Sequence, residues 1–363
     1  MDPIPAGVRG RGAATNPASR FVRLAYAEDT DPQIGPEEEG ASVPKTLFFR
    51  DDSRSIVARN DSPDVGFEAS VNPYRGCEHG CAYCYARPTH EYFGLSAGLD
   101  FETRIFVKED AAELLRKELA SSRWKPQVLA MSGVTDPYQP VERRLGITRR
   151  CLEVLVEYRN PVAIVTKSAL VTRDLDLLAE LARHRASAVF LSVTTLDRAL
   201  ARDLEPRAAT PAARLEAVEA AAKAGVPVGV MVAPVIPGLT DHEIPAILEA
   251  AARAGARFAG YTMLRLPGAV AGVFEAWLAA HRPTRKERVL NRVREIRDGR
   301  LNDPRFGSRM RGEGPFADLV ASLFEKARRR VGLSAGGPDL STAAFRRPGA
   351  SQGTLFEDPK SPG

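Results

Sequence analysis

The sequence predicts an α/β protein built on a partial TIM-like barrel of six βα repeats. Three observations support this fold class. Short apolar runs alternate with amphipathic segments, polar residues follow most of these runs, and a loop near the first run carries three cysteines. Apolar runs of about four to eight residues separated by amphipathic helices are typical of a parallel sheet with helical crossovers.

The predicted elements follow one another regularly along the chain. The first strand lies near residues 68–72 and leads into the cysteine loop. Side chains at the carboxyl ends of such strands meet on one side of the fold, so the residues after each run are candidate site residues. The later strands are predicted at 128–132, 162–165, 188–193, 228–232 and 258–264, with helices at 148–158, 172–183, 211–224 and 241–254.

The two ends of the chain differ in composition from the middle. Residues 1–43 and 331–363 are rich in Gly, Pro, Ser and charge, which predicts disordered tails. Between them, residues 44–281 would form the barrel and residues 282–330 a basic helical extension. That extension carries 15 Lys and Arg against 7 Asp and Glu. Such an excess fits a polyanionic partner and a solvated helix face equally well.

The overall composition is that of a soluble globular protein. Of the 363 residues, 44% are hydrophobic and 27% charged, and the net charge is +5. No apolar run reaches the roughly 18 residues of a membrane span, and the N-terminal stretch lacks the apolar core of a signal peptide. We therefore expect a cytoplasmic protein without a membrane partner.

Cys77, Cys81 and Cys84 stand in one short loop with the spacing C-x3-C-x2-C. Thiolates are soft ligands that select iron–sulfur clusters, zinc or copper(I). A [4Fe–4S] cluster held by three thiolates keeps one iron without a protein ligand, and that open position is available for chemistry. Three cysteines in one loop do not indicate a disulfide framework. The fourth cysteine, Cys151, falls within a predicted helix, where a small buried thiol is common.

A structural zinc site is the alternative interpretation of this loop. Such a site usually pairs two Cys or Cys/His knuckles, and His79 or His90 could complete a Cys3His set. The protein would then be a zinc-stabilised nucleic-acid-binding module without catalysis.

Polar residues also follow the later strands. Asp136 comes after the second strand, Lys167 after the third, and Ser192 ends the fourth. An amino-acid cofactor has an ammonium group that pairs with a carboxylate such as Asp136, and a carboxylate that pairs with a donor such as Lys167. Each residue alone has an ordinary structural role in a turn or loop. Their repetition after successive strands favours a bound cofactor of this kind.

From about residue 71 to residue 266, the chain resembles the spore photoproduct lyase-like branch of the radical S-adenosylmethionine (radical SAM) superfamily, which is related to DNA repair photolyases. The cysteine loop carries the resemblance, and Thr135-Asp136, Thr166-Lys167-Ser168 and Ser192 support it. The resemblance implies a barrel core and a [4Fe–4S] cluster on Cys77, Cys81 and Cys84. It also implies reductive cleavage of S-adenosyl-L-methionine to a 5′-deoxyadenosyl radical, and a reductant such as flavodoxin or ferredoxin.

The resemblance further implies individual cofactor contacts and one departure. Spore photoproduct lyases supply a hydrogen-donor cysteine near the motif after the second strand, where this chain has Ser132, Gly133 and Val134. Thymine-dimer reversal therefore does not follow, and the reaction stays open between lyase and other radical chemistry on an unassigned substrate, with nucleic acid as one candidate. The alternative hydrogen donors are Tyr261, Tyr138 and Tyr85. The implied contacts are Tyr83 for adenine, Ser132, Thr135 and Asp136 for the amino group, and Lys167 and Ser192 for the carboxylate.

The C-terminal tail contains the segment Gln352-Gly353-Thr354-Leu355-Phe356. It resembles the peptide with which bacterial repair and replication proteins dock on the sliding clamp. Leu355 and Phe356 are adjacent large apolar residues in a polar tail, and such anchors fill pockets on partner proteins. The tail thus predicts a sliding-clamp partner bound through Gln352, Leu355 and Phe356, with a chance match or a packing role as the alternatives.

Overall fold

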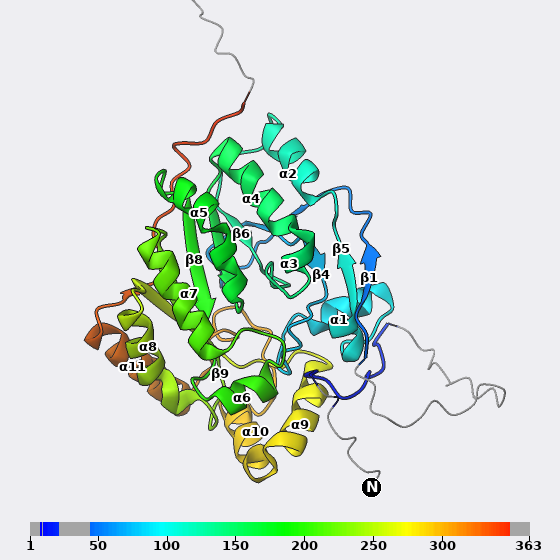
Figure 1. Ribbon diagram of the computed structural model, residues 1–363. Helices are drawn as coiled ribbons and strands as arrows, with labels where there is room; N and C mark the ends of the chain where they lie inside the picture. The colour runs from blue at the N-terminus through cyan, green and yellow to red at the C-terminus, as the bar shows by residue number, and fades with distance from the viewer. Residues whose placement is uncertain (1–7, 9, 22–43, 349–363) are drawn as a thin grey trace, which may run out of the picture.

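The computed structural model describes residues 8, 10–21 and 44–348 (Figure 1). Its main feature is an eight-stranded sheet with the order β11-β10-β9-β8-β7-β6-β3-β2. The six strands from β3 to β10 in this order pair in parallel, and they match the six predicted strands. The predicted fold class is confirmed. These strands are β3 (Ala69–Val71), β6 (Leu129–Met131), β7 (Val162–Thr166), β8 (Ser187–Ser192), β9 (Val228–Val235) and β10 (Phe258–Met263).

The two edges of this sheet do not meet. The antiparallel strand β2 (Val57–Arg59) lies at one edge, and the two-residue strand β11 (Ser334–Ala335) lies at the other. Among the described residues, no strand pairing joins these edges, so the barrel is open.

Helices cover one face of the sheet (Figure 1). The predicted helix at 148–158 is present, but the one predicted at 172–183 is split into a 3-10 turn, η2 (Ala169–Asp174), and α5. The helix predicted from residue 241 likewise begins with the 3-10 turn η3 (Asp241–Glu243). The covering helices are α2 (Ala111–Ala120), α4 (Ile147–Tyr158), α5 (Leu175–Ala182), α7 (Pro211–Lys223), α8 (Ile244–Arg253) and α11 (Pro315–Arg330).

Strand alternation decides which side chains face these helices. In β8, Val189 and Leu191 belong to the main hydrophobic core, whereas Phe190 and Ser192 point to the other face. In β7, Val165 points to that same other face and is 37% exposed, although β7 lies in the middle of the sheet. The face away from the helices is therefore open to solvent at Val165.

A second, smaller sheet was not predicted from the sequence. It has the order β1-β5-β4, with strands β1 (Leu47–Arg50), β5 (Arg104–Val107) and β4 (Tyr74–Arg75). Its strands are short and partly exposed, so they lack the apolar runs that mark the main sheet. The cysteine loop lies between β4 and the 3-10 helix η1 (Arg87–Phe93), and the short helix α1 (Leu99–Thr103) leads into β5.

The helical segment predicted at 282–330 packs on the barrel. It contains the 3-10 turn η4 (Pro283–Arg285), α10 (Lys286–Glu295) and α11. Val289, Leu290 and Val293 of α10 share a hydrophobic cluster with Cys81 and Tyr83, and α9 (Val270–His281) contributes to the same cluster. Several of its basic side chains are neutralised within the protein, in the pairs Arg282–Asp203, Arg292–Glu295, Arg305–Asp303, Arg309–Asp64, Arg328–Glu325 and Arg330–Glu249.

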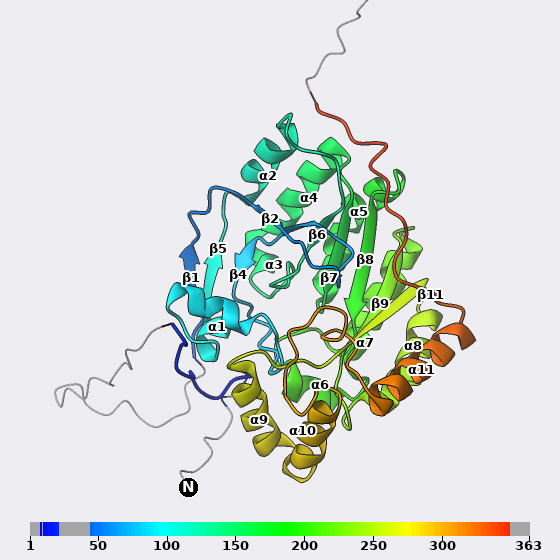
Figure 2. The same ribbon diagram turned by 180° about the vertical axis from the view of Figure 1, so that it is seen from behind.

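Part of the C-terminal segment predicted from residue 331 contacts the rest of the described chain. Ser341 donates its backbone N–H to the carbonyl of Arg185 at 2.8 Å, and Arg346 donates its own to that of Tyr158 at 2.9 Å. The Arg347 side chain donates to the carbonyl of Trp124 at 2.9 Å. These carbonyls precede β8, β7 and β6, so the segment crosses the amino ends of the strands (Figure 2).

Composition could not reveal these contacts. The arginines of this segment suggest a solvated tail, but in the structure Arg346 and Arg347 donate to backbone carbonyls. Gln352, Leu355 and Phe356 lie outside the described residues. No helix in the described part of the chain is both long and apolar enough to span a membrane.

Candidate active site at the carboxyl ends of the strands

The cysteine loop lies at the carboxyl ends of the strands, as predicted. Cys77 and Cys81 are buried, Cys84 is partly exposed, and all three are free thiols. Gly80 allows the tight path of this loop, because its φ is +66° and a Cβ there would lie 2.6 Å from an Oε atom of Glu102. Cys84 and Cys81 are joined by a backbone hydrogen bond of 3.2 Å, so they belong to one turn.

The three thiols share one electrostatic environment. Burial raises the pKa of each of them, and Cys81 and Cys84 each raise the pKa of Cys77 further. Lys167 acts in the opposite direction on Cys81 and Cys84 because its ammonium favours the thiolate. Thiols must be deprotonated to bind a metal, so metal binding here would release protons.

Three free thiols in one loop are a donor set that suits an iron–sulfur cluster. Within the described ranges, the structure arranges no three His, Cys, Asp or Glu side chains as a group that could hold one metal ion. Zinc would need its ligands gathered at about 2.0–2.3 Å from one centre. A cluster places each thiolate on a different iron, so three cysteines around one loop suit it without such gathering.

Asp136 connects the ends of two strands with the cysteine loop. Its carboxylate accepts hydrogen bonds from the Thr166 hydroxyl and the Lys167 backbone N–H, both at 2.7 Å. His79, which stands between Cys77 and Cys81, lies 3.4 Å from the same carboxylate. Burial acts to raise the pKa of Asp136, but His79 and the donated hydrogen bonds outweigh it and hold that pKa at about 2. Asp136 is therefore an ionised residue that holds the cysteine loop against the end of β7, and its oxygens already accept hydrogen bonds from the protein.

A buried network links Tyr83 to Ser192. The Tyr83 hydroxyl donates to Glu205, and Arg214 donates to Glu205 from the other side. Arg214 also donates to the carbonyl of Ser192 at 2.9 Å. Burial acts to raise the pKa of Glu205, yet Arg214 and Lys167 outweigh it and hold that pKa at about 2. Tyr83 and Ser192, both predicted cofactor contacts, are thus positioned by one buried ion pair.

Sequence reasoning did not identify Glu205 and Arg214. Glu205 follows the helix α6 (Arg198–Leu204), and Arg214 lies in α7, where a charged residue is ordinary. Only the fold shows that both side chains are almost completely buried.

Lys167 is the cation that faces this network. Its ammonium donates to the Ala233 carbonyl at 3.3 Å and lies 5.7 Å from the centre of the Tyr83 ring. It comes directly after β7, and strand alternation directs it to the solvent-accessible face. The structure therefore brings Lys167 beside Tyr83, as a cofactor site spanning both residues requires.

Ser132 and Thr135 lie in a turn after β6 that is held from β3. Ser132 has a φ of 141°, a backbone conformation that side chains rarely adopt. The Asn72 side chain accepts the N–H groups of Val134 at 3.1 Å and Thr135 at 3.5 Å. Thr135 is buried, and its hydroxyl donates to the Tyr74 carbonyl at 3.0 Å. Asn72 thus places the turn, and Thr135 has a structural partner.

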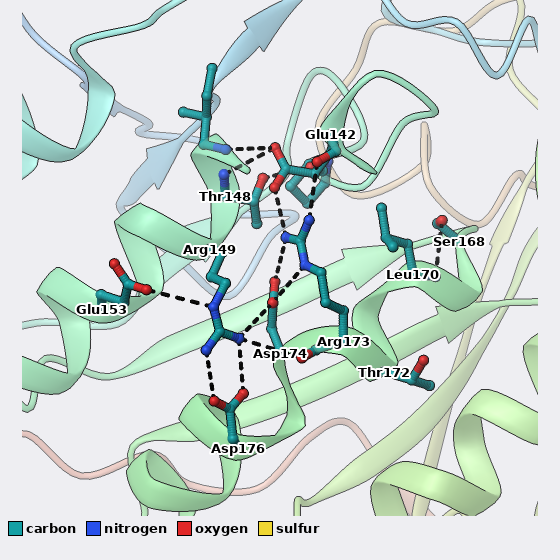
Figure 3. A network of polar contacts seen from close by, with 12 residues as sticks. Glu142, Thr148, Arg149, Glu153, Ser168, Leu170, Thr172, Arg173, Asp174 and Asp176 are labelled. Carbon is teal, nitrogen blue, oxygen red and sulfur yellow. Dashed lines mark hydrogen bonds and ion pairs between the residues drawn. The ribbon is translucent and has the colours of Figure 1, made fainter. Parts of the chain in front are cut away.

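A polar network supports the segment after this turn from the helix side (Figure 3). The buried Glu142 carboxylate accepts from Arg173 at 2.7 Å and from the N–H groups of Ile147 and Thr148 at 3.0 and 3.1 Å. Arg149 joins α4 to Asp174 and Asp176 beside α5. These contacts connect the segment that carries Asp136 to the helical layer.

The three candidate hydrogen donors occupy different places. Tyr261 faces the helix side of the sheet, where its ring lies 4.6 Å from that of Phe324 in α11. Tyr138 is buried in the main core beneath Arg173. Tyr85 follows Cys84 directly and is 45% exposed. Of the three, Tyr85 is the one next to a cysteine of the loop.

An N-terminal segment predicted to be disordered covers the cysteine loop. Gly12 and Ala13 donate their N–H groups to the Glu102 carboxylate at 3.1 and 2.9 Å. Arg87, which ends the loop, also donates to Glu102. Gly12 lies directly against Gly80, because a Cβ on Gly12 would be 1.8 Å from the Gly80 carbonyl oxygen. Residues 10–21 are among the described residues, and Gly12 and Ala13 are held by a carboxylate far along the chain.

Comparison with known proteins assigns this arrangement to a family. The Radical SAM superfamily profile matches residues 71–251. An uncharacterized protein of Mycobacterium tuberculosis is 38% identical over 265 residues, which is 72% of this chain and 75% of that protein. A radical SAM Nalpha-GlyT isomerase of Pseudomonas phage M6 is 27% identical over 174 residues, covering 48% of this chain and 34% of that protein.

The fold is also that of solved enzymes. A spore photoproduct lyase variant with bound S-adenosylmethionine and dinucleoside spore photoproduct superposes with a TM-score of 0.56 at 16% identity, over 79% of this chain and 80% of that one. The lyase complexed with dinucleoside spore photoproduct gives a TM-score of 0.55 at 16% identity, over 79% and 81% of the two chains.

Proposed function

The chain belongs to the radical SAM superfamily, and on that premise we propose that it is a radical SAM enzyme whose hydrogen-abstraction substrate is a nucleic acid. When bound, a [4Fe–4S] cluster and S-adenosylmethionine supply the 5′-deoxyadenosyl radical that abstracts hydrogen. Cys77, Cys81 and Cys84 would hold the cluster, since they are the three free thiols of the loop.

The observation that carries the proposal is the position of Lys167 beside the cysteine loop. Its ammonium lies 5.7 Å from the Tyr83 ring centre, on the face of the sheet away from the helices. A lysine is a suitable partner for the carboxylate of an amino-acid cofactor, and an adjacent aromatic ring suits a purine. We assign the carboxylate to Lys167 and Ser192, and the adenine side to Tyr83.

The residues around these contacts position them. Asp136 orients the backbone of Lys167 through a 2.7 Å hydrogen bond, and Glu205 orients the Tyr83 hydroxyl. Because Asp136 is already saturated by protein donors, we assign the cofactor ammonium to acceptors of the turn at Ser132 and Thr135 beside it. This turn includes the strained backbone of Ser132.

A nucleic-acid substrate is supported by the structural relatives and by the open face of the sheet. The lyase with the same fold binds a dinucleoside photoproduct. In this chain the exposed Val165 shows that the face beside Lys167 is accessible to solvent. The donor cysteine expected for photoproduct reversal is absent after β6, so we propose a different radical reaction. Tyr85 is the hydrogen-donor candidate that the geometry favours.

Two partners complete the proposal. A one-electron reductant such as flavodoxin or ferredoxin would supply the cluster, since the chemistry is reductive. The segment with Gln352, Leu355 and Phe356 would bind a sliding clamp. The position of the preceding residues supports this assignment. Residues 341–347 cross the amino ends of the strands, so the chain leaves the barrel on the side away from the cysteine loop.

The zinc-binding alternative is not favoured. It explains neither Lys167 beside Tyr83 nor the match to a catalytic superfamily over residues 71–251.

The experiment is anaerobic reconstitution of the full chain with iron and sulfide, followed by reduction in the presence of S-adenosylmethionine. We expect a brown protein with about four irons per chain that releases 5′-deoxyadenosine. Incubation with native and damaged oligonucleotides, followed by mass spectrometry, then tests the substrate. A colourless protein that retains about one zinc would contradict the enzyme assignment, and unchanged oligonucleotides would contradict the substrate assignment alone.

A further inference from the structure

Arg265 and Tyr85 form a contact across the mouth of the open barrel. Arg265 comes two residues after the end of β10, and its guanidinium carbon lies 4.7 Å from the centre of the Tyr85 ring. Tyr85 also donates its hydroxyl to the Gly133 carbonyl at 2.6 Å, in the turn after β6. In the sheet, β6 and β10 are separated by β7, β8 and β9. Tyr85 therefore spans the mouth, with Gly133 on one side and Arg265 on the other.

The Arg265 side chain makes no hydrogen bond or ion pair within the described part of the chain, although it is only partly exposed. Burial lowers its pKa, so its environment does not compensate the charge. None of its nitrogens is a buried atom without a partner, so the guanidinium donors reach solvent and are available to a ligand.

The neighbouring Arg297 and Arg309, by contrast, each donate to partners within the protein. Arg297 donates to the carbonyls of Leu264 and Arg309, at 2.8 and 2.7 Å. Arg309 pairs with Asp64, and the Gly307 N–H also donates to Asp64 at 2.7 Å. Asp64, the carboxylate whose charge acts on Arg265, is thus already paired with other donors. Arg265 is left as a cation that faces the mouth with its donors available.

Tyr85 adds an exposed aromatic surface beside this cation. Its ring is 45% exposed, and the hydroxyl bond to Gly133 fixes its orientation. An arginine next to an exposed aromatic ring is the usual combination for binding a single nucleic-acid strand, because the ring stacks on a base and the guanidinium fork matches a phosphate.

We infer that Arg265 binds a backbone phosphate of a single nucleic-acid strand and that Tyr85 stacks on an adjoining base, so that the pair holds the substrate over the cysteine loop. This inference rests on the proposed nucleic-acid function and names the residues that recognise the strand. The site lies on the barrel itself, and not on the basic helical segment at 282–330 that composition had singled out.

The test measures binding of a short fluorescein-labelled oligothymidylate to the full reconstituted chain by fluorescence anisotropy, at several salt concentrations. We expect Arg265→Met to weaken binding about tenfold and to lower the slope of log K against log salt by about 0.7, the value for one phosphate contact on a single strand. Arg265→Lys should recover the salt slope but only part of the affinity, because lysine keeps the charge without the fork.

Arg311→Met is the matched control. The Arg311 guanidinium carbon lies 4.0 Å from the centre of the Tyr261 ring, the same kind of contact, but this tyrosine faces the helix side of the sheet. We expect this variant to bind the oligonucleotide as the unmodified protein does.

The outcomes separate the inference from the function on which it rests. If the unmodified protein binds the strand and Arg265→Met binds it equally well, the role of Arg265 is wrong and the proposed function stands. If the unmodified protein does not bind the strand, both the inference and the nucleic-acid substrate assignment are wrong, whereas the enzyme assignment stands. If Arg265→Met instead loses affinity for S-adenosylmethionine in equilibrium dialysis while oligonucleotide binding persists, Arg265 serves the cofactor carboxylate and the inference is overturned.

Discussion

The Asp136 carboxylate accepts the backbone N–H of Lys167 at 2.7 Å, which joins the end of β6 to the end of β7 beneath the cysteine loop. Because the same carboxylate also holds Thr166 and approaches His79, one side chain sets the relative position of the loop and of the cation beside Tyr83. A residue that sequence patterns assign to cofactor binding thus has a demonstrable role in arranging the site.

Asp136→Asn should lower both stability and cluster loading. An amide nitrogen in place of one carboxylate oxygen would face an N–H or O–H donor, and an unsatisfied buried group costs about 1–3 kcal/mol. We expect a lower melting temperature and less iron per chain after reconstitution. Asp176→Asn is the control, because Asp176 is an exposed partner of Arg149 and such pairs contribute about 0–1 kcal/mol. Equal melting temperatures and equal iron loading of the two variants would contradict the role of Asp136 in positioning the loop.

The buried pair of Glu205 and Arg214 should show strong coupling. Removing one partner leaves an uncompensated buried charge, so Arg214→Met and Glu205→Gln should each destabilise the protein, Arg214→Met by about 3–5 kcal/mol. The double variant should be less destabilised than the sum of the two. Denaturant unfolding of all four proteins gives the coupling free energy. Additive effects would show that the pair does not act as a unit.

Cys81→Ala should abolish cluster binding and reductive cleavage of S-adenosylmethionine. Two thiolates cannot replace the three of the loop, and Cys151 is buried in the main core. Cys151→Ala is the matched control, for which we expect full iron loading and a stability loss of about 1 kcal/mol from the small cavity. Iron and sulfide analysis and release of 5′-deoxyadenosine are the measurements. A Cys81→Ala protein that kept both would refute the cluster assignment.

Truncation after Ser351 should abolish capture by a sliding clamp in a pull-down. The deleted segment contains Gln352, Leu355 and Phe356, and the contacts of Ser341, Arg346 and Arg347 stay intact. We therefore expect an unchanged melting temperature. Leu355→Ala with Phe356→Ala in the full chain should have the same effect as truncation, and clamp capture by that variant would rule the motif out.

The central sheet was predictable because its signals are local. The apolar runs at 128–132, 162–165 and 188–193 became β6, β7 and β8 with shifts of one residue at most ends. The small β1-β5-β4 sheet was not predictable, because β4 has two residues and β1 is exposed along its length. Strands of this kind are specified by their pairing partners and leave little periodicity in the sequence.

The positions of the described parts of the two terminal segments were likewise not predictable from local sequence signals. Residues 11–13 contact Glu102, and the segment at 341–347 contacts carbonyls that precede three strands. In both cases the partner lies far away along the chain, and composition records only that the segment is polar.

By itself, the sequence determined the barrel repeats, the cysteine spacing and the polar residues that follow the strands, since each of these depends on residues near one another in the chain. Only the tertiary structure decided that Tyr83 meets Glu205, 122 residues away, and that Tyr261 faces the helices while Tyr85 faces the mouth. The physical reason is that burial and ion pairing are set by which strands become neighbours. The availability of Arg265 for a ligand can be recognised only in the structure, where Asp64 is paired with Arg309.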